Sequence, residues 1–574
     1  MYIQKNKVPG ENGKVYTSVL LCRKYRMDGK IKTEVISNLS KMPPELIVSL
    51  ENIFHHGLDA LVAAKDILVE KAIDYGQILL LIQLMDKLKI DSILNKELPQ
   101  YSPLIKAMVV GKIVTSGSKL GIYNWIMRNP AIASKLGLDT EGLKVDDLYM
   151  ALAFVNSRQD TIEKKWFSHH GKGNQDNIFL YDITSTYFEG TQNELAHFGY
   201  NRDKKKGKLQ INVGLITNSL GFPLKIEVFE GNVNDHKTVL GQVAHLKEKF
   251  NAKNIIFVGD RGMKIRYNLD ELKEAEKEGI QYITGLTHLE IDDLLQRNVI
   301  QLSLFGKDLA EIEHEGIRYV LSLNPELRDE ETVYLKKLKS RVDKELLEIQ
   351  SSWGKRRLRN LENIVKLKEG DTNKKLTTQF DDKKLDNYKI KVSKILSKTK
   401  ASKYYEITEI SNTQFKVSFN VKAYEHAIQM CGLYVVSSTI KSSEMDKETV
   451  RETYKNLQKV EHAFRDFKSD NIQLRPVFHR NEAQTRGHVF VSMLSYSVIK
   501  ELEDKIFPFL KIWNKDKNQK ISFNDVMEEL KNIKLCTLNI GTGTNKIQIT
   551  DLNELQTEIL NLFEMKKSSL ETFM

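Results

Sequence analysis

The chain has 574 residues, of which 41% are hydrophobic and 28% charged, with a formal net charge of +11. This length predicts about three or four domains of a soluble globular protein and excludes a single core. No run approaches the roughly 20 apolar residues of a membrane span, and the N-terminus lacks the apolar stretch of a secretory signal. Its three cysteines, Cys22, Cys431 and Cys536, are widely separated and lack zinc-type spacing, which fits a reducing cytoplasm.

Turn signals and helical periodicity divide the N-terminal third of the chain. Residues 1–42 predict a small β-rich segment, because short β-type runs alternate with turns such as Asp28-Gly29. Residues 43–174 predict a mainly helical domain. Within it, helices at about 105–115 and 120–127 flank a Gly-Ser break, so a helix-turn-helix that binds DNA ends is one interpretation. Ordinary helical packing is the other.

Residues 175–289 change to a strand-dominated pattern. Strands are predicted at about 178–188, 209–217 and 222–229, the last two as a hairpin. A helix at about 236–250, a strand ending at Asp260, a helix at about 266–279 and a strand at about 281–286 follow. Three antiparallel strands followed by helix, strand, helix and strand predict the first part of an α/β, ribonuclease H-like core with a mixed sheet and flanking helices.

Residues 290–430 predict a long insertion into this core. Between Lys336 and Lys400 there are 20 Lys or Arg residues and 9 Asp or Glu residues, a surplus that equals the net charge of the whole chain. Such a concentrated surplus is typical of a polyanion-binding element. A solvated helix surface is the alternative. Strands are expected at 404–410 and 415–421.

The core is predicted to resume over residues 431–510, and residues 511–574 predict a helical C-terminal tail. A helix at about 447–468 places Tyr454, Leu457, Glu461, Phe464 and Lys468 on one stripe, because their spacings are three and four residues. Glu461 is expected to face the core. The glycine-rich run near residue 541 lacks the spacing of a phosphate loop, so no nucleotide cofactor is expected.

Three acidic residues carry the predicted chemistry. Asp182 lies within an apolar strand, Asp260 ends another, and Glu461 lies on the helix stripe. A carboxylate in such surroundings is costly unless it is paired or binds metal. In a ribonuclease H-like sheet the two aspartates converge although 78 positions separate them. An oxygen-ligand set suits Mg²⁺, with Mn²⁺ as a substitute, and supports two-metal phosphodiester chemistry.

The chain resembles bacterial insertion-sequence transposases of the DDE type, in the subgroup with a Tyr-x2-Arg-x3-Glu-x6-Lys signature. Tyr454, Glu461 and Lys468 match the signature in register, whereas Leu457 occupies the arginine position. The stretches around Asp182 and Asp260, and residues 227–238, resemble other blocks of the family.

This resemblance implies a catalytic and metal-binding triad of Asp182, Asp260 and Glu461. It further implies binding of double-stranded terminal inverted repeats, hydrolytic nicking, transfer to target DNA, and a homodimer on DNA in the bacterial nucleoid. Tyr454 and Lys468 are expected to contact DNA phosphates, which position a strand without reading its sequence. Arg465 or Lys455 is expected to replace the contact that Leu457 lacks. Leu457→Arg would then tighten binding of the DNA ends.

Two other functions remain open at this stage. A ribonuclease H-like nuclease without strand transfer would share the triad. A degenerate DNA-binding or DNA-bridging protein would bind DNA and nick nothing, and Leu457 gives that alternative some support.

Overall fold

The computed structural model describes most of the chain, in two compact units. The described ranges are 1–9, 15–27, 29–56, 68–115, 117–171, 177–248, 250, 254–261, 279–306, 309–368, 382–411, 414–469, 472–475, 477–539 and 545–572. The first unit comprises residues 1–92, 106–145 and 498–574, and the second comprises 93–105 and 146–497.

The first unit begins with a three-stranded antiparallel sheet, β1 (Tyr2–Pro9), β2 (Val15–Met27) and β3 (Lys30–Asn38). The predicted strands of the N-terminal segment are thereby confirmed. Gly29 makes the β2–β3 turn at φ +76°, a conformation that glycine adopts without strain. Helix α1 (Pro44–His56) packs on this sheet through Ile47, which lies in a small core with Val19 and Leu39.

A second small sheet joins distant parts of the chain in the same unit. Strand β15 (Lys534–Asn539) pairs with β16 (Asn545–Ile549) on one side and with β4 (Leu68–Asp74) on the other. These strands correct the prediction of a helical tail over residues 511–574 and add one strand, β4, to the region 43–174 that was predicted to be mainly helical. Local sequence could not predict this sheet, because β4 pairs with β15, a strand more than 450 positions away.

Helices account for the rest of the first unit and the segments that lead into the second. The predicted helices on either side of the Gly-Ser break are confirmed as α4 and α5, which approach closely because Gly111 has no Cβ to meet Ile122. The helices of these regions are α2 (Gly76–Lys87), α3 (Ile90–Glu97), α4 (Ser102–Thr115), α5 (Lys119–Arg128), α6 (Pro130–Lys135), α7 (Val145–His170), α17 (Phe523–Lys531), α18 (Glu554–Leu562) and α19 (Lys567–Thr572).

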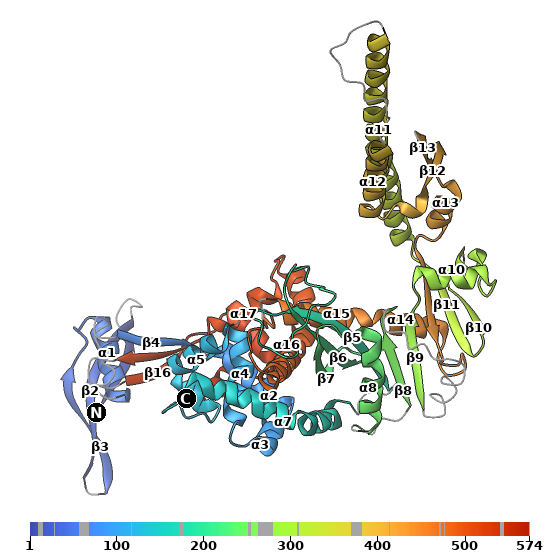
Figure 1. Ribbon diagram of the computed structural model, residues 1–574. Helices are drawn as coiled ribbons and strands as arrows, with labels where there is room; N and C mark the ends of the chain where they lie inside the picture. The colour runs from blue at the N-terminus through green and yellow to red at the C-terminus, as the bar shows by residue number, and fades with distance from the viewer. Residues whose placement is uncertain are drawn as a thin grey trace. The chain divides into compact units, whose positions relative to one another are not determined.

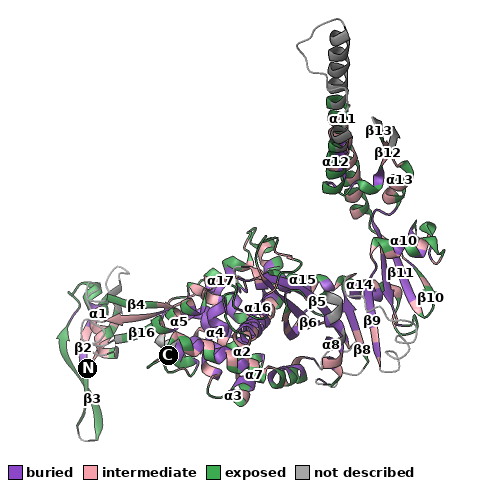
Figure 2. Cartoon of the chain, viewed as in Figure 1, coloured by how far each residue is buried: buried purple, intermediate pink, exposed green. Residues whose placement is uncertain are grey.

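The second unit is built on an eight-stranded mixed sheet whose strands are mostly buried (Figures 1 and 2). Its order is β10-β11-β14-β9-β8-β5-β6-β7. The strands are β5 (Ile178–Tyr187), β6 (Gln210–Asn218), β7 (Pro223–Glu230), β8 (Ile255–Gly259), β9 (Ile280–Gly285), β10 (Ala310–His314), β11 (Ile317–Leu323) and β14 (Leu433–Ser438).

Five of these strands form a ribonuclease H-like core. Three antiparallel strands, β7, β6 and β5, are followed by β8 and β9, both parallel to β5. Every strand predicted in this region is confirmed, and so is the helix between β7 and β8, α8 (Asp235–Glu248). The helix expected at about 266–279 lies outside the described residues.

The two faces of this sheet are covered by different helices. Tyr181 and Ile183 pack with Val239 and Val243 of α8, so α8 covers the face to which the odd-numbered side chains of β5 point. The even-numbered positions, among them Asp182, point to the other face, where α15 (Leu457–Lys468) lies against β5 and β6.

The sheet continues beyond the fifth strand of the core. β14 pairs with β9, and β11 and β10 follow outward, all antiparallel. The predicted resumption of the core near residue 431 therefore corresponds to β14. The structure differs from the sequence prediction in the segment from 290, because β10 and β11 are part of the sheet and share a core with α10 (His288–Gln296).

A separate, mostly helical body follows β11. Helices α11 (Pro325–Lys368) and α12 (Asp382–Lys398) run side by side, and a hairpin of β12 (Tyr405–Ser411) and β13 (Gln414–Phe419) precedes α13 (Val421–Gln429) (Figure 1). These elements share their own core. Within the described ranges 336–368 and 382–398, the basic segment is thus helical, as predicted. The two predicted strands are confirmed as β12 and β13.

The helix expected at 447–468 is two helices, α14 (Lys447–Lys455) and α15, with Asn456 between them. The periodic pattern survives the break because Asn456 keeps helical backbone angles. The chain then enters α16 (Glu482–Asp516), which carries it from the second unit into the first.

Candidate active site

The two predicted aspartates lie on neighbouring parallel strands, Asp182 in the middle of β5 and Asp260 directly after β8. The register of β5 and β8 pairs Tyr181 with Gly259, so the next positions on the two strands are Asp182 and Asp260. The Oδ1 atom of each aspartate accepts the backbone N–H of the following residue at 2.7 Å. Adjacent strands lie about 4.8 Å apart, so the two carboxylates lie side by side near the centre of the sheet, where β8 ends.

Glu461 reaches the same face of the sheet from α15. At the other end of this helix, Lys468 Nζ donates to Thr184 Oγ1 at 2.7 Å. Thr184 and Asp182 are two positions apart on β5 and therefore point to one face. Glu461 is exposed, whereas its helical neighbours Val460 and Phe464 are buried.

The electrostatics of Asp182 place the three carboxylates within range of one another. The pKa of Asp182 is raised to about 7, chiefly by burial. The negative charges of Asp260 and Glu461 act in the same direction, while the N–H of Ile183 and the charge of Arg202 oppose it. Like charges gathered at one point disfavour the ionised form, and a bound cation removes that penalty. All the donors are oxygen atoms, which fits a hard divalent cation.

Tyr454 contacts one of these aspartates directly. Its hydroxyl donates to Asp260 Oδ1 at 3.2 Å, and its ring packs edge-on against Tyr434 at 5.6 Å between centroids. Burial, together with the negative charge of Asp260, raises the pKa of Tyr454. The side chain is 7% exposed, so its hydroxyl faces the site and not open solvent.

Lys468 is tied into the protein on the same face. Besides Thr184, its ammonium group contacts Asp203 Oδ1 at 2.9 Å, and Arg475 binds the same carboxylate. The pKa of Lys468 is lowered, mainly by burial. The sequence prediction missed both Asp203 and Arg475. The sequence did contain one signal for Asp203, because it is the single acidic residue in the basic run 202–208.

The remaining positions of the signature differ in exposure. Leu457 is 7% exposed, so an arginine there would bury a cation. The expectation that Leu457→Arg tightens DNA binding is therefore withdrawn. Arg465 is exposed on α15, and Lys455 is exposed and pairs with Glu452 at 3.0 Å.

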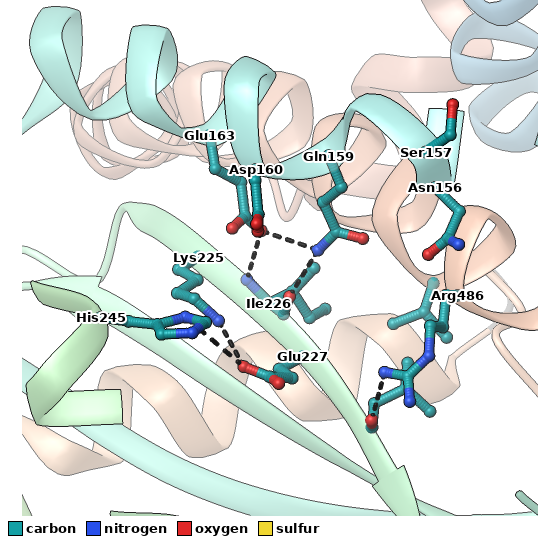
Figure 3. Close-up of a pocket in the computed structure, with 12 residues that line it drawn as sticks. Asn156, Ser157, Gln159, Asp160, Glu163, Lys225, Ile226, Glu227, His245 and Arg486 are labelled. Carbon is teal, nitrogen blue, oxygen red and sulfur yellow. Dashed lines mark hydrogen bonds and ion pairs between the residues drawn. The ribbon is translucent and has the colours of Figure 1, made fainter. Parts of the chain in front are cut away.

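A pocket of about 200 Å³ lies on the opposite face of the sheet, between α7, β7, α8 and α16 (Figure 3). Lys225 Nζ binds Glu227 Oε2 at 2.5 Å, and Gln159 donates to Glu163 at 2.8 Å. Ile226, which lies between the first two residues, is aligned through Leu215 with Asp182. Lys225 and Glu227 consequently point away from the face that carries the aspartates.

Comparison with known proteins identifies the family to which this chain belongs. Residues 173–498 match the family model described as the transposase DDE domain, which is more than half of the chain. The chain therefore belongs to the DDE transposases, metal-dependent enzymes that cleave DNA and transfer its strands. Residues 3–65 match the N-terminal domain of IS1634 family transposases, so this is a transposase of the insertion-sequence type.

Among solved structures, the chain is similar to piggyBac transposase in a synaptic complex with hairpin DNA, determined by cryo-electron microscopy. The similarity covers 87% of this chain and 84% of that one, at 8% sequence identity and a TM-score of 0.33. No curated protein matches the chain. Across the described ranges, none of the helices combines the length and apolar character needed to cross a membrane.

Proposed function

We propose that this transposase cleaves and joins DNA where β8 ends beside the middle of β5, with Asp182, Asp260 and Glu461 as its metal ligands. The observation that carries the proposal is the alignment of Asp182 with Asp260 on neighbouring strands, with Glu461 in electrostatic range. Bound Mg²⁺, or Mn²⁺ in its place, would activate the attacking oxygen and stabilise the leaving oxygen of an in-line displacement.

The protein's own groups prepare this site. Tyr454 donates to Asp260 and restrains its carboxylate, a positioning role supported by the 3.2 Å hydrogen bond. Lys468 fastens the end of α15 to β5 through Thr184 and leaves its charge close to the acidic cluster. Arg465 is exposed on the same helix, and we assign to it a contact with a DNA phosphate.

The substrate that fits this enzyme is double-stranded DNA with terminal inverted repeats. Hydrolytic nicking would free a 3′-hydroxyl, which then attacks the target DNA. Two ends must be paired in such a reaction, so we propose that the chain acts as a homodimer on DNA. The excess of positive charge between residues 336 and 400 supports a role of α11 and α12 in holding the DNA.

The test is a nicking assay on a duplex that carries the DNA flanking this gene, with Mg²⁺ or Mn²⁺. Wild type should nick at the element boundary, and Asp260→Ala should bind the same DNA without nicking it. Asp293→Ala is a matched control, because Asp293 is an exposed acid that pairs only loosely with Arg297 at 3.6 Å. Cleavage retained in Asp260→Ala would refute the site.

Two outcomes would redirect the assignment. Wild-type nicking without any joined product, in a reaction supplied with target DNA, would favour a ribonuclease H-like nuclease. Binding without nicking by the wild type with either metal would favour a DNA-binding or DNA-bridging protein. The dimer is tested separately, by measuring the mass of the complex on a single end and on paired ends.

A further inference from the structure

The chain between β5 and β6 contains a loop that is held in place by buried charges. We call residues 198–208 the aromatic–basic loop. Within it the side chain of Asp203 is 2% exposed, and its carboxylate accepts from Lys468, from Arg475 and, at 3.3 Å, from the backbone N–H of Tyr187. A fully paired buried carboxylate fixes the segment that carries it. The loop therefore has a defined conformation although it is neither helix nor strand.

This fixed loop exposes two aromatic rings. Phe198 is 69% exposed and Tyr200 is 82% exposed. A third ring, Phe478, is 65% exposed on a segment that is bonded to the chain just before the loop, since Asn193 Nδ2 donates to the carbonyl of His479. Scattered apolar side chains are common on surfaces, but several large rings presented by one anchored segment indicate a binding surface.

Positive charge surrounds these rings. The loop has five Lys or Arg residues and one acid, Asp203, which is already paired with Lys468 and Arg475. The guanidinium carbon of Arg202 lies 5.8 Å from the centre of the Tyr200 ring. The loop's four lysines are exposed: Lys204, Lys205, Lys206 and Lys208. Aromatic rings among cations match a single-stranded nucleic acid, in which bases can stack on rings while phosphates pair with lysines.

The loop lies beside the carboxylate cluster. Lys468 contacts both Asp203 of the loop and Thr184 of β5, and Thr184 is two positions from Asp182. Two residues of a strand span roughly 7 Å. The charge of Arg202 also acts on Asp182. A DNA strand in the site would thus have the loop within a few nucleotides of the reacting phosphate.

We propose that the aromatic–basic loop binds an unpaired segment of the DNA strand next to the cleavage site, with bases stacked on Phe198 and Tyr200. Paired bases are stacked inside a duplex and cannot cover these rings, so the rings discriminate unpaired from paired DNA. This inference rests on the proposed function, because it is that function which makes DNA the polymer bound by the loop. An acidic peptide is the other partner that such a surface could take, and the test includes it.

The test measures binding by fluorescence anisotropy in EDTA, which separates binding from cleavage. The probes are a labelled oligothymidylate, a labelled duplex and a labelled polyglutamate peptide. Phe198→Ala/Tyr200→Ala should weaken oligothymidylate binding by about tenfold for each ring removed, and duplex binding by less than about twofold. Phe507→Ala, which removes a ring that is 47% exposed on α16, should change neither.

Substitutions at Tyr200 separate stacking from bulk. Tyr200→Phe should bind oligothymidylate like the wild type, whereas Tyr200→Leu, which keeps apolar volume without a ring, should bind like Tyr200→Ala. Equal losses on single strand and duplex, wild-type binding by Tyr200→Leu, or tighter binding of polyglutamate than of oligothymidylate would each overturn the proposal. Thermal melting of every variant controls for folding.

Failure of this inference is distinguishable from failure of the proposed function. A wild type that nicks DNA, together with a double variant that binds oligothymidylate normally, would refute the loop alone. A wild type that never nicks, but whose single-strand binding depends on Phe198 and Tyr200, would refute the catalytic assignment alone.

Discussion

Two groups of acidic side chains lie on opposite faces of the same sheet, and they are neutralised in different ways. On the α8 face, Glu227 is partly buried next to the buried Lys225. Burial raises its pKa, but the charge of Lys225 and hydrogen bonds from Gln242 and Lys225 outweigh burial, so the pKa is lowered. On the α15 face, Asp182 has two further carboxylates in range, and its pKa is raised.

This contrast indicates what each group is for. A buried carboxylate that has its own cation is a cross-link, and here it fastens α8 to β7 through Gln242. Carboxylates gathered with a shortage of cations destabilise the folded protein unless a cation binds from solution. Of these two groups, the one on the α15 face is the one whose negative charges are not compensated by the protein, and that is where the chemistry is proposed. Variants on the α15 face should therefore lose nicking activity and keep their stability, whereas variants on the α8 face should change stability and keep nicking activity.

The largest effect is expected for the cluster on the α15 face. Asp182→Asn, Asp260→Asn and Glu461→Gln should each reduce the nicking rate by at least about 10³-fold, because each removes a ligand for the metal. Without divalent cations, their melting temperatures should equal or exceed that of the wild type, since each change removes one of three like charges. A large drop in melting temperature in EDTA would contradict the comparison.

Removing the cation on the α8 face should instead destabilise the protein. Lys225→Met leaves buried carboxylates uncompensated and should reduce the free energy of unfolding by about 3 kcal/mol or more, measured by denaturant titration. Lys208→Met is the control, because Lys208 and Glu189 form a half-exposed pair worth less than about 1 kcal/mol. The nicking rate of Lys225→Met per folded molecule should stay within about twofold of the wild-type rate, since this substitution touches no metal ligand.

Glu163 provides a pH-dependent test on the same face. Its pKa is raised to about 7, with burial as the largest cause and Lys225 opposing it. The folded protein therefore holds a proton that the unfolded chain releases above pH about 4.5, and stability falls as the pH rises towards 7. Glu163→Gln should remove this loss and gain roughly 2 to 3 kcal/mol at pH 8. Identical melting curves of the two proteins from pH 5 to pH 8 would show that Glu163 is not buried as described.

The smallest effect concerns the orientation of one carboxylate. Tyr454→Phe removes the hydroxyl that donates to Asp260 and should slow nicking by about tenfold, which corresponds to one hydrogen bond to a charged group. Tyr434→Phe, at the ring packed against Tyr454, should leave the rate nearly unchanged. If the tyrosine restrains Asp260, the metal concentration for half-maximal rate should rise in Tyr454→Phe alone.

Much of the fold could be predicted from local pattern. The strands of the ribonuclease H-like core are β-rich runs separated by turn residues, and their order alone places Asp182 beside Asp260. Helical periodicity correctly placed Tyr454, Leu457 and Phe464 on one buried stripe, even though Asn456 divides the helix in two. Glu461, which was expected to face the core on the same stripe, is exposed instead. The basic segment was correctly predicted as helical, since it has long charged side chains and few helix breakers.

Contacts between distant segments could not be predicted. Asp203 and Lys468 are 265 positions apart, and no local pattern shows that the lysine expected on a phosphate is held by a carboxylate of a loop. The strand β4 is completed only by β15 from the far end of the chain. The burial of Leu457 could not be predicted either. Its sequence context matched the position of a DNA-contacting arginine, and only the packing of the fold showed the position to be buried.

The sequence by itself determined most of the elements, the order of the core strands and which carboxylates could meet, because backbone propensity and apolar periodicity act over a few residues. Tertiary structure decided which charges are paired. The energy of a charged side chain depends on every neighbour and on its burial, and those neighbours come from segments hundreds of residues apart. That is why the candidate triad could be predicted from the sequence, while the anchoring of Lys468 and the fixed aromatic–basic loop are visible only in the fold.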